Sequence, residues 1–530
     1  MRMTIWRIFG IAALLLALLA WTGCGDVFRP IANPIPGPTP DPKAYHYVIV
    51  ASQNAPGYPG SGMQIDVSGD TDVGAVHAGA TGVVQPGQGP VHAALLGPSA
   101  GRVYVANGLS DTVSTFTPAS TLLPIGTVTT ITLPPGSNPV FAHSTESSTM
   151  YAADYDASNV AVISAVSNAV TSLIPVGLNP AVLAETPNGR KLYSVNLGDG
   201  TVTSINTVDK SIAKTIGGLN GPVWAVASLD SSLLFVLSGS GSLFTINTFN
   251  DTVSSSVSVD SGANFLLLDH HFNRLYITSP ANNSLTILDA GAANISSNSP
   301  PALIKRIVLA PGAPNPVMVT ALADGSQAYV ISNQVSPVSF TWEVTAIRAS
   351  DNSLLNGGQP IASGTVDLTT ILPPALATCA AARFRTSITS SVDNSRVYAA
   401  ICDAGTTYTI RTSDDSCVDP ATSTCVNVVS PVSAYPMISG VVNISDVTVS
   451  SPIATFAYSL ASGSPPRVGM VMAITGMSDG GNNGTFQVTA TGNGTFSVSN
   501  SAAVAATGQS GTGSGSQLPP QNPVWVVAGP

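Results

Sequence analysis

The chain has 530 residues, of which only 9% are charged, and its formal net charge is −10 at pH 7. This length exceeds that of one ordinary core, so more than one structural unit is expected. The negative charge and the lack of any Lys/Arg cluster exclude nucleic acid as a partner, because phosphates require a basic surface. The abundance of Val, Ser, Thr and Gly favours many short strands and tight turns over helices.

The first residues predict export. Two arginines precede a short apolar run over residues 8–21. This is the pattern of a signal sequence, and the run is shorter than the roughly 20 residues of a membrane-spanning helix. Trp21-Thr-Gly-Cys24 resembles the cleavage box of lipoproteins, which implies that residues 1–24 direct export and that Cys24 carries lipid. The alternatives are an ordinary secretory signal and an uncleaved anchor, and under each of them the protein leaves the cytoplasm.

Residues 25–43 follow as a spacer. Six prolines fall within this stretch, which favours an extended polyproline-II conformation over a folded segment. At ~3.1 Å per residue such a spacer reaches up to ~60 Å from the membrane. It therefore has the length to present the rest of the chain to a partner.

A repeated phrase organises the next part of the chain. It reads Arg102-Val-Tyr-Val-Ala-Asn107 and Lys191-Leu-Tyr-Ser-Val-Asn196, and each copy is followed by a polar turn and an alternating strand-like run. The middle copies lie at the roughly 40–45 residues that are typical of a four-stranded propeller blade. Its aromatic residue marks eight units: Tyr47, Tyr104, Tyr151, Tyr193, Phe235, Tyr276, Tyr329 and Tyr398.

A second phrase begins several of the units and also ends the chain. Gly89-Pro-Val-His-Ala-Ala94 and Gly221-Pro-Val-Trp-Ala-Val226 are apolar on both faces, as the innermost strand of a blade should be. The first unit lacks this strand, and Asn522-Pro-Val-Trp-Val-Val-Ala528 can supply it, which closes the ring. We predict an all-β fold, a β-propeller of about eight four-stranded blades, over residues 44–436 plus 522–530. A seven-bladed ring with one degenerate unit is the alternative.

The repeat resembles the YVTN-type β-propeller family of bacterial surface and periplasmic proteins. The hallmark Tyr-Val-Thr-Asn stands here as Tyr-Val-Ala-Asn, Tyr-Ser-Val-Asn and Tyr-Ile-Thr-Ser. The resemblance covers about residues 45–410 and the last strand. The lactonase-like propellers share the expected fold, but no residue set in this chain matches their active sites.

Four cysteines remain besides Cys24, and all of them lie in the last blade region. An even number outside the cytoplasm predicts two disulfides. The favoured pairs are Cys379–Cys402, which ties the inner strand of the eighth blade to its second strand, and Cys417–Cys425, which closes a small loop. Spacing alone leaves all three possible pairings open. A metal site lacks support, because no Cys-x-x-Cys motif or nearby His is present.

Residues 437–508 predict a small β-module inserted before the closing strand. Two matching phrases, Gly484-Thr-Phe-Gln-Val-Thr489 and Gly494-Thr-Phe-Ser-Val-Ser499, are separated by turn residues, as hairpins require. Residues 509–521 are rich in Gly, Ser and Pro and are expected to be a flexible return linker. The module is similar to small β-modules of bacterial secreted proteins with a Gly-x-Asn-Asn-Gly-Thr-Phe phrase. It is either an accessory binding domain or a spacer.

Few residues suggest chemistry. His92 and His143 lie on consecutive inner strands with the same parity, and Glu185 ends the next one, so these three are the candidate channel residues. Two histidines do not make a metal site, because three protein ligands are usual. Asp269-His270-His271 and the Asn- and Asp-rich turns after the second strands are expected to be ordinary polar turns. No motif for a cofactor, a metal or a nucleophilic serine is present.

These observations favour a non-enzymatic binding or scaffold propeller, lipid-anchored in the cell envelope on its periplasmic face or at the surface. The expected partners are the membrane, through the anchor, and an envelope protein or glycan. The alternatives are a lactonase-like hydrolase that uses the central cleft and a structural surface-layer component. Three or more carboxylate, His or Asn side chains converging on the channel would favour the enzyme, whereas an apolar or empty channel would count against it.

Overall fold

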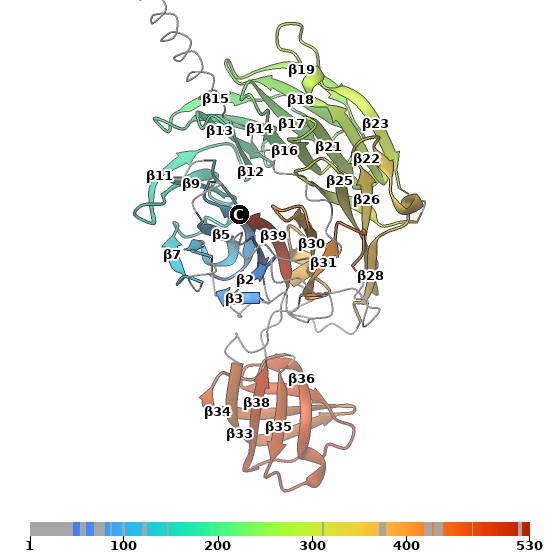
Figure 1. Cartoon of the computed structure of the whole chain (residues 1–530). Coiled ribbons are helices and arrows are strands. Elements are labelled where there is room, and N and C mark those ends of the chain that lie inside the picture. The colour runs from blue at the N-terminus through green and yellow to red at the C-terminus, as the bar shows by residue number, and fades with distance from the viewer. Residues whose placement is uncertain are drawn as a thin grey trace, which may run out of the picture. The chain divides into compact units, whose positions relative to one another are not determined.

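The computed structural model describes residues 46–53, 60–67, 80–84, 87–97, 101–118, 125–145, 148–309, 312–369, 378–417, 427–428, 438–468, 470–517 and 522–529. These residues form eight separate sheets and one closed six-stranded barrel. Figure 1 shows the eight sheets arranged as blades of a ring. The eight-bladed propeller is confirmed, and the seven-bladed alternative is wrong. The predicted signal sequence, Cys24 and the spacer lie outside the described residues.

Blade 1 is built from sequence segments at opposite ends of the chain. The last strand pairs antiparallel with the first one, with Val48 opposite Ala528 and Val50 opposite Val526. Figure 1 shows this red strand beside the blue ones. The predicted closure of the ring by the C-terminal strand is therefore confirmed. From the inside outward the blade consists of β39 (Pro523–Gly529), β1 (Tyr47–Ser52), β2 (Ser61–Asp66) and β3 (Ala80–Val84).

Blades 2 to 5 follow one plan, in which four antiparallel strands run outward in chain order. Blade 2 has β4 (Pro90–Leu95), β5 (Val103–Asn107), β6 (Thr112–Phe116) and β7 (Thr129–Thr132). Blade 3 has β8 (Pro139–His143), β9 (Thr149–Asp154), β10 (Asn159–Ser164) and β11 (Ala169–Pro175). Blade 4 has β12 (Pro180–Glu185), β13 (Lys191–Asn196), β14 (Thr201–Asn206) and β15 (Ile212–Ile216). Blade 5 has β16 (Pro222–Ala227), β17 (Leu233–Ser238), β18 (Ser242–Asn247) and β19 (Thr252–Ser258).

Blades 6 to 8 keep this plan, with one addition in blade 7, whose third strand pairs with two outer strands. Blade 6 has β20 (Phe265–Asp269), β21 (Arg274–Ser279), β22 (Ser284–Asp289) and β23 (Ala302–Val308). Blade 7 has β24 (Asn315–Ala321), β25 (Gln327–Val335), β26 (Ser339–Arg348), β27 (Ser353–Leu354) and β28 (Ala362–Asp367). Blade 8 has β29 (Thr386–Ser390), β30 (Arg396–Ile401), β31 (Thr406–Arg411) and β32 (Asn427–Val428).

Helical structure is confined to single turns within the described residues. None of these helices is long and apolar enough to cross a membrane. Residues 378–381 form a short helix before β29. The 3-10 turns are η1 (Gly108–Ser110), η2 (Pro280–Asn282), η3 (Ala290–Ala292), η4 (Asn356–Gly358) and η6 (Gly480–Asn482).

The tyrosine of the repeated phrase serves to join blades. Tyr193 is fully buried on β13, and its hydroxyl donates to Asp251 Oδ1 of the next blade at 2.7 Å. Lys191, two residues earlier, donates to Asp251 Oδ2 at 2.5 Å and to the Thr248 carbonyl at 2.6 Å. Asp251 has a φ of 55° in the β18–β19 turn. The phrase therefore clasps the outer turn of the following blade, and we call this arrangement the blade clasp.

The blade clasp recurs with different side chains. Arg102 donates to Asn168 Oδ1 at 3.1 Å, and Tyr329 donates to Asp415 Oδ1 at 2.7 Å. It is interrupted between blades 5 and 6, where Leu233 and Phe235 replace the basic residue and the tyrosine. A cavity of about 430 Å³ lies beside these two side chains. The one phenylalanine among the eight repeat aromatics therefore marks the junction where the following turn, which holds η3, has another shape.

The inserted module is a closed barrel with a core of its own. Phe456 and Phe496 stack inside it with ring centroids 5.2 Å apart, among buried Val, Ile and Met side chains. The strand order around the barrel is β33-β34-β37-β36-β35-β38. The strands are β33 (Ile438–Ser450), β34 (Ile453–Gly463), β35 (Val471–Thr475), β36 (Gly484–Gly492), β37 (Thr495–Ser499) and β38 (Gly511–Gln517).

The prediction that residues 509–521 form a flexible linker is wrong for residues 511–517. Gly511–Gln517 forms β38, which pairs with both β33 and β35 and closes the barrel. The glycines that suggested a flexible linker are required by packing inside the barrel. A Cβ atom on Gly515 would lie 2.1 Å from Met472 Sδ, and one on Gly511 would lie 2.0 Å from Met477 Sδ. The alternate glycines make room for core methionines, so this strand is rich in glycine and still ordered.

Candidate functional site

The channel of the propeller is filled by aromatic side chains from six of the eight blades. Each belongs to an inner strand or, for Phe384, to the segment just before one. Neighbouring rings around the channel contact one another. The ring centroid of His92 lies 3.9 Å from that of Phe141 and 4.3 Å from that of Trp525, and the centroids of Trp224 and Phe265 lie 4.6 Å apart. We call this set the channel collar; its members are His92, Phe141, Trp224, Phe265, Phe384 and Trp525.

Phe384 joins the two sides of the collar. Its ring lies 4.6 Å from Trp525 of blade 1 and 6.3 Å from Trp224 of blade 5. Because blades 8 and 5 are not neighbours, the contact with Trp224 crosses the channel. Aromatic pairs at these separations stabilise one another beyond the area that they bury. The middle of the channel is therefore a packed aromatic plug.

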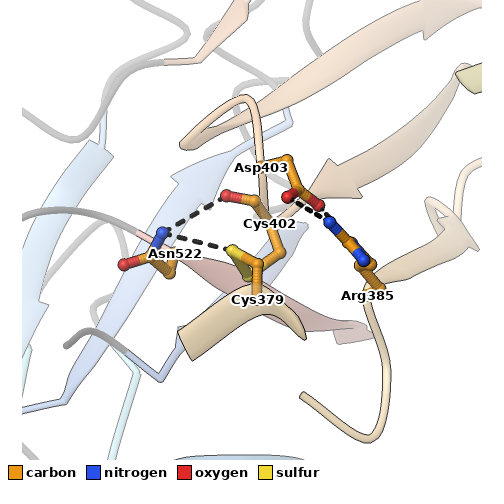
Figure 2. The surroundings of a disulfide bond; sticks show 5 residues. All are labelled: Cys379, Arg385, Cys402, Asp403 and Asn522. Atoms are coloured by element: carbon orange, nitrogen blue, oxygen red, sulfur yellow. Dashed lines mark hydrogen bonds and ion pairs between the residues drawn. A yellow bond between two sulfur atoms is a disulfide. The ribbon is translucent and has the colours of Figure 1, made fainter. Parts of the chain in front are cut away.

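Phe384 belongs to a short segment, residues 378–385, that we call the channel hook. One end is held by the disulfide Cys379–Cys402. The other end is held by Arg385, whose Nε and Nη2 donate to the two oxygens of the buried Asp403 at 2.6 and 2.7 Å. Figure 2 shows both anchors and the Asn522 amide, which donates to Cys379 Sγ and to the Cys402 carbonyl. The hook is therefore fixed on both sides of Phe384 and tied to the closing strand.

The predicted pair Cys379–Cys402 is confirmed, although its placement needs a correction. Cys379 lies in the helical turn 378–381 and not on an inner strand, because β29 begins only at Thr386. Cys402 lies directly after β30. Cys417 is also disulfide-bonded, and its predicted partner Cys425 lies outside the described residues, so that pairing stays a prediction.

A pocket of about 340 Å³ opens beside the collar at the end of the channel where the inner strands begin. Its walls include Trp224, Phe265 and Phe384, and Arg383 of the channel hook reaches into the lining. The Arg383 guanidinium lies 5.2 Å from the Phe384 ring. Burial lowers its pKa to about 10, against the opposing effect of Tyr155, so it stays charged at neutral pH. Within the described part of the chain no carboxylate forms an ion pair with Arg383.

The three candidate channel residues lie on or at the end of the inner strands of blades 2, 3 and 4. His92 belongs to the collar, and its Nδ1 accepts from the Ala142 N–H at 3.3 Å. Glu185 Oε2 accepts from the Thr145 N–H at 2.8 Å, just beyond His143. No group of three or more His, Cys, Asp or Glu that could hold a metal occurs among the residues described.

Both histidines are neutral at pH 7. Burial lowers the pKa of His143 to about 4. Burial, and then electrostatic interactions with Arg383 and with His143, hold the pKa of His92 well below its usual value. A neutral, stacked His92 acts as an aromatic wall of the channel. The effect of Arg383 on His92 also places the two side chains within electrostatic reach of each other.

The polar turns are occupied by structural hydrogen bonds. Asp111 accepts from the backbone N–H groups of Gly136 and Asn138 at 2.8 Å each. Asp199 Oδ2 accepts from the Leu178 N–H at 2.9 Å. The His271 N–H donates to Asp269 Oδ1 at 2.8 Å, as in an ordinary polar turn. These bonds fix the links between strands and blades.

Sequence reasoning missed most of the collar and, apart from Cys379, the channel hook. The signal for the collar was present, because the residue two positions after the entry proline is His92, Phe141, Trp224 or Trp525 in four of the units. These positions share one parity, so they face the same way. Arg383 and Phe384 had no such signal, because they lie outside the repeat.

No model of a protein family matches the chain, and no curated protein matches its sequence. Solved β-propeller structures are similar in fold. The periplasmic gluconolactonase PpgL of Pseudomonas aeruginosa has 14% identity and a TM-score of 0.45, over 60% of this chain and 96% of that one. The dihydro-heme d1 dehydrogenase NirN has 10% identity and a TM-score of 0.48, over 70% and 71%. A putative 6-phosphogluconolactonase of Bacteroides fragilis has 12% identity and a TM-score of 0.42, over 73% and 94%. The likeness concerns the propeller fold alone.

Proposed function

We propose that this chain is a non-enzymatic binding protein of the cell envelope, whose propeller presents a ligand pocket at one end of its channel. The observation that carries the proposal is the lining of that pocket, where aromatic side chains meet one open guanidinium. Concave, mostly apolar pockets with few polar groups are typical of small-molecule sites. The pocket volume of about 340 Å³ lies within the range of such sites.

Export and anchoring are part of the same proposal. The Cys379–Cys402 disulfide supports export, because such bonds persist in oxidising compartments. Cys24 would then carry the lipid, and the Pro-rich spacer would hold the ring away from the membrane. The replacement Cys24→Ser should move the protein from the membrane fraction to the soluble fraction of cells. Retention of the variant in the membrane fraction would contradict the lipid anchor.

The binding role is tested by crosslinking in cells. The full-length protein is crosslinked in place, and the captured molecules are identified by mass spectrometry. We expect an envelope protein or glycan attached near the channel mouth or the barrel module. Capture of the protein itself, mapped to one repeated contact, would instead support a surface-layer component.

The rival hydrolase is tested with a panel of lactones and glycosides. The purified full-length protein is incubated with each compound, and hydrolysis is followed by titration of the acid released. We expect no hydrolysis above the buffer rate. Turnover that disappears when the pocket residue Arg383 is replaced by Gln would overturn the non-enzymatic proposal in favour of the enzyme.

A further inference from the structure

The pocket beside the channel collar contains one charge that the protein does not neutralise. Arg385, its neighbour in the channel hook, is fully engaged with Asp403. Arg383 has neither an ion pair nor a hydrogen bond to the described residues, and its one ring contact is with Phe384. A half-buried guanidinium without an acidic partner is unfavourable unless another anion meets it.

The amide groups of the pocket are already occupied. Asn264 donates to the Val317 carbonyl at 2.8 Å and accepts from the Thr278 hydroxyl at 2.8 Å. The Asn333 amide donates to Thr386 Oγ1 at 3.0 Å. These two side chains therefore shape the wall, whereas Arg383, which also lines the pocket, has no hydrogen bond to the described residues.

The backbone that carries Arg383 is anchored on both sides. The Cys379–Cys402 disulfide and the Arg385–Asp403 pair hold the channel hook on both sides of it. Preorganised groups bind with a smaller entropic cost than mobile ones. A planar guanidinium in a fixed place can also hold a carboxylate through two parallel hydrogen bonds.

The walls around this charge are apolar and largely aromatic. Trp224 and Phe265 lie with their ring centroids 4.6 Å apart, and Phe384 lies across from them. Met318 and Val317 complete the apolar side. A ligand that covers these surfaces needs a flat, apolar body. A phosphate fits less well, because within the described lining only one free cation is available for it.

From this geometry we infer that the pocket recognises a small carboxylate carried on a flat apolar body, with Arg383 as the anion anchor. The inference rests on the proposed binding function and names the chemical class of its ligand. The carboxylate meets the guanidinium, and the apolar body lies against Trp224, Phe265 and Phe384. No covalent step is involved.

The test compares three matched probes on the purified full-length protein by isothermal titration calorimetry. The probes share a naphthalene ring: 2-naphthoate is anionic, 2-naphthalenemethanol is neutral and 2-naphthalenemethylamine is cationic. We expect 2-naphthoate to bind on the order of tenfold more tightly than the alcohol, because charge-assisted hydrogen bonds are the strong ones. The amine is expected to bind least.

Variants of Arg383 assign that preference to one side chain. Arg383→Gln should remove the tenfold advantage of 2-naphthoate and leave the affinity for the alcohol unchanged. Arg383→Lys should keep part of the advantage, because it keeps the charge but loses the bidentate geometry. Arg383→Glu should reverse the preference toward the amine. The matched control is Arg348→Gln, which removes an exposed arginine on the surface and should change none of the three affinities.

Each other outcome overturns the inference in a recognisable way. Equal affinity of the wild type for 2-naphthoate and the alcohol would show that the pocket binds apolar rings regardless of their charge. The proposed binding function would then stand, but the carboxylate preference would be wrong. A naphthoate preference that survives in Arg383→Gln would place the anion site elsewhere. If no probe binds, this ligand class is excluded, and crosslinking alone decides the broader proposal. The wild-type comparison holds even if one variant fails to fold.

Discussion

The blade clasp gives the repeated tyrosine a physical role. In blade 4 its hydroxyl reaches the Asp251 carboxylate of the next blade, and burial together with that carboxylate raises the pKa of Tyr193. In blade 2 the hydroxyl of Tyr104 is buried without a hydrogen-bond partner among the described residues. The repeated tyrosine is therefore buried in both of these blades but makes this hydrogen bond in only one of them.

This difference predicts unequal effects of one substitution. Tyr193→Phe should lower the free energy of unfolding by about 1–3 kcal/mol, because it leaves part of the buried Asp251 carboxylate unsatisfied. Tyr104→Phe is the matched control and should cost close to nothing. Urea denaturation of both variants, followed by tryptophan fluorescence, checks the difference. Equal losses in the two variants would mean that the tyrosine acts through packing alone.

Asp154 is an acidic residue in an environment that disfavours its charged form. It is fully buried, and neither carboxylate oxygen has a hydrogen-bond partner among the described residues. Burial, and then the Asp111 charge, raise the pKa of Asp154 to about 8. The equivalent Asn107 and Asn196 each donate to two hydroxyls on the next strand. Blade 3 has Ala161 where the second of these hydroxyls would be.

Asp154→Asn should therefore stabilise the protein, with an effect that depends on pH. The folded protein holds this proton up to about pH 8, whereas an unfolded Asp releases it near pH 4, so wild-type stability falls as pH rises through that window. The gain from the variant should grow from pH 4 to pH 8 and then level off. The introduced amide can also donate to Asn159 Oδ1, which lacks a donor among the described residues.

Thermal unfolding of Asp154→Asn at several pH values between 4 and 9 measures this effect. The reciprocal change Asn196→Asp, at the matching position of blade 4, is the control. It should destabilise the protein, and more so as the pH rises. A gain for Asp154→Asn that is the same at every pH would show that proton binding at this site does not set the stability.

At the scale of elements, β38 has the Gly- and Ser-rich composition of a linker but the structure of a strand. Its alternate glycines face Met470, Met472 and Met477 in the barrel core, while Ser514 between them is exposed. Gly515→Val should lower the stability of the barrel by about 1–3 kcal/mol through overpacking. Ser514→Ala, on the outer face, should have little effect. Hydrogen exchange over residues 438–517 measures both, and equal protection in the two variants would contradict the packing role.

The same scale explains what the sequence could and could not predict. The repeat predicted the blades and the closing strand, because each blade buries the same pattern of side chains. It could not predict β38, since Gly and Ser are also typical of linkers, and the methionines that fill the space lie some 40 residues earlier. No other unit of the repeat has a segment equivalent to the channel hook. The role of Arg383 and Phe384 in the channel could therefore not be predicted without the structure.

At the scale of the whole molecule, one strand holds the ring together. β39 pairs with β1, and its Trp525 contacts His92 of blade 2 and Phe384 of the channel hook. Asn522, just before it, bonds to both cysteines of the Cys379–Cys402 disulfide. The last residues of the chain thus connect blades 1, 2 and 8 at a single seam.

Truncation after Gln521 should therefore open the ring. Without β39 the edge of β1 is unpaired and the collar loses a tryptophan, so we expect earlier urea unfolding and self-association through the exposed edge. Light scattering and limited proteolysis measure both effects. The matched control replaces residues 438–517 by a short Gly/Ser linker and keeps β39. This variant should remain a monomer with the wild-type unfolding of the ring, because the barrel has its own core. If the truncated protein also stays monomeric and unfolds like the wild type, the closing strand completes a blade without holding the ring, and the hydrophobic contacts between blades suffice.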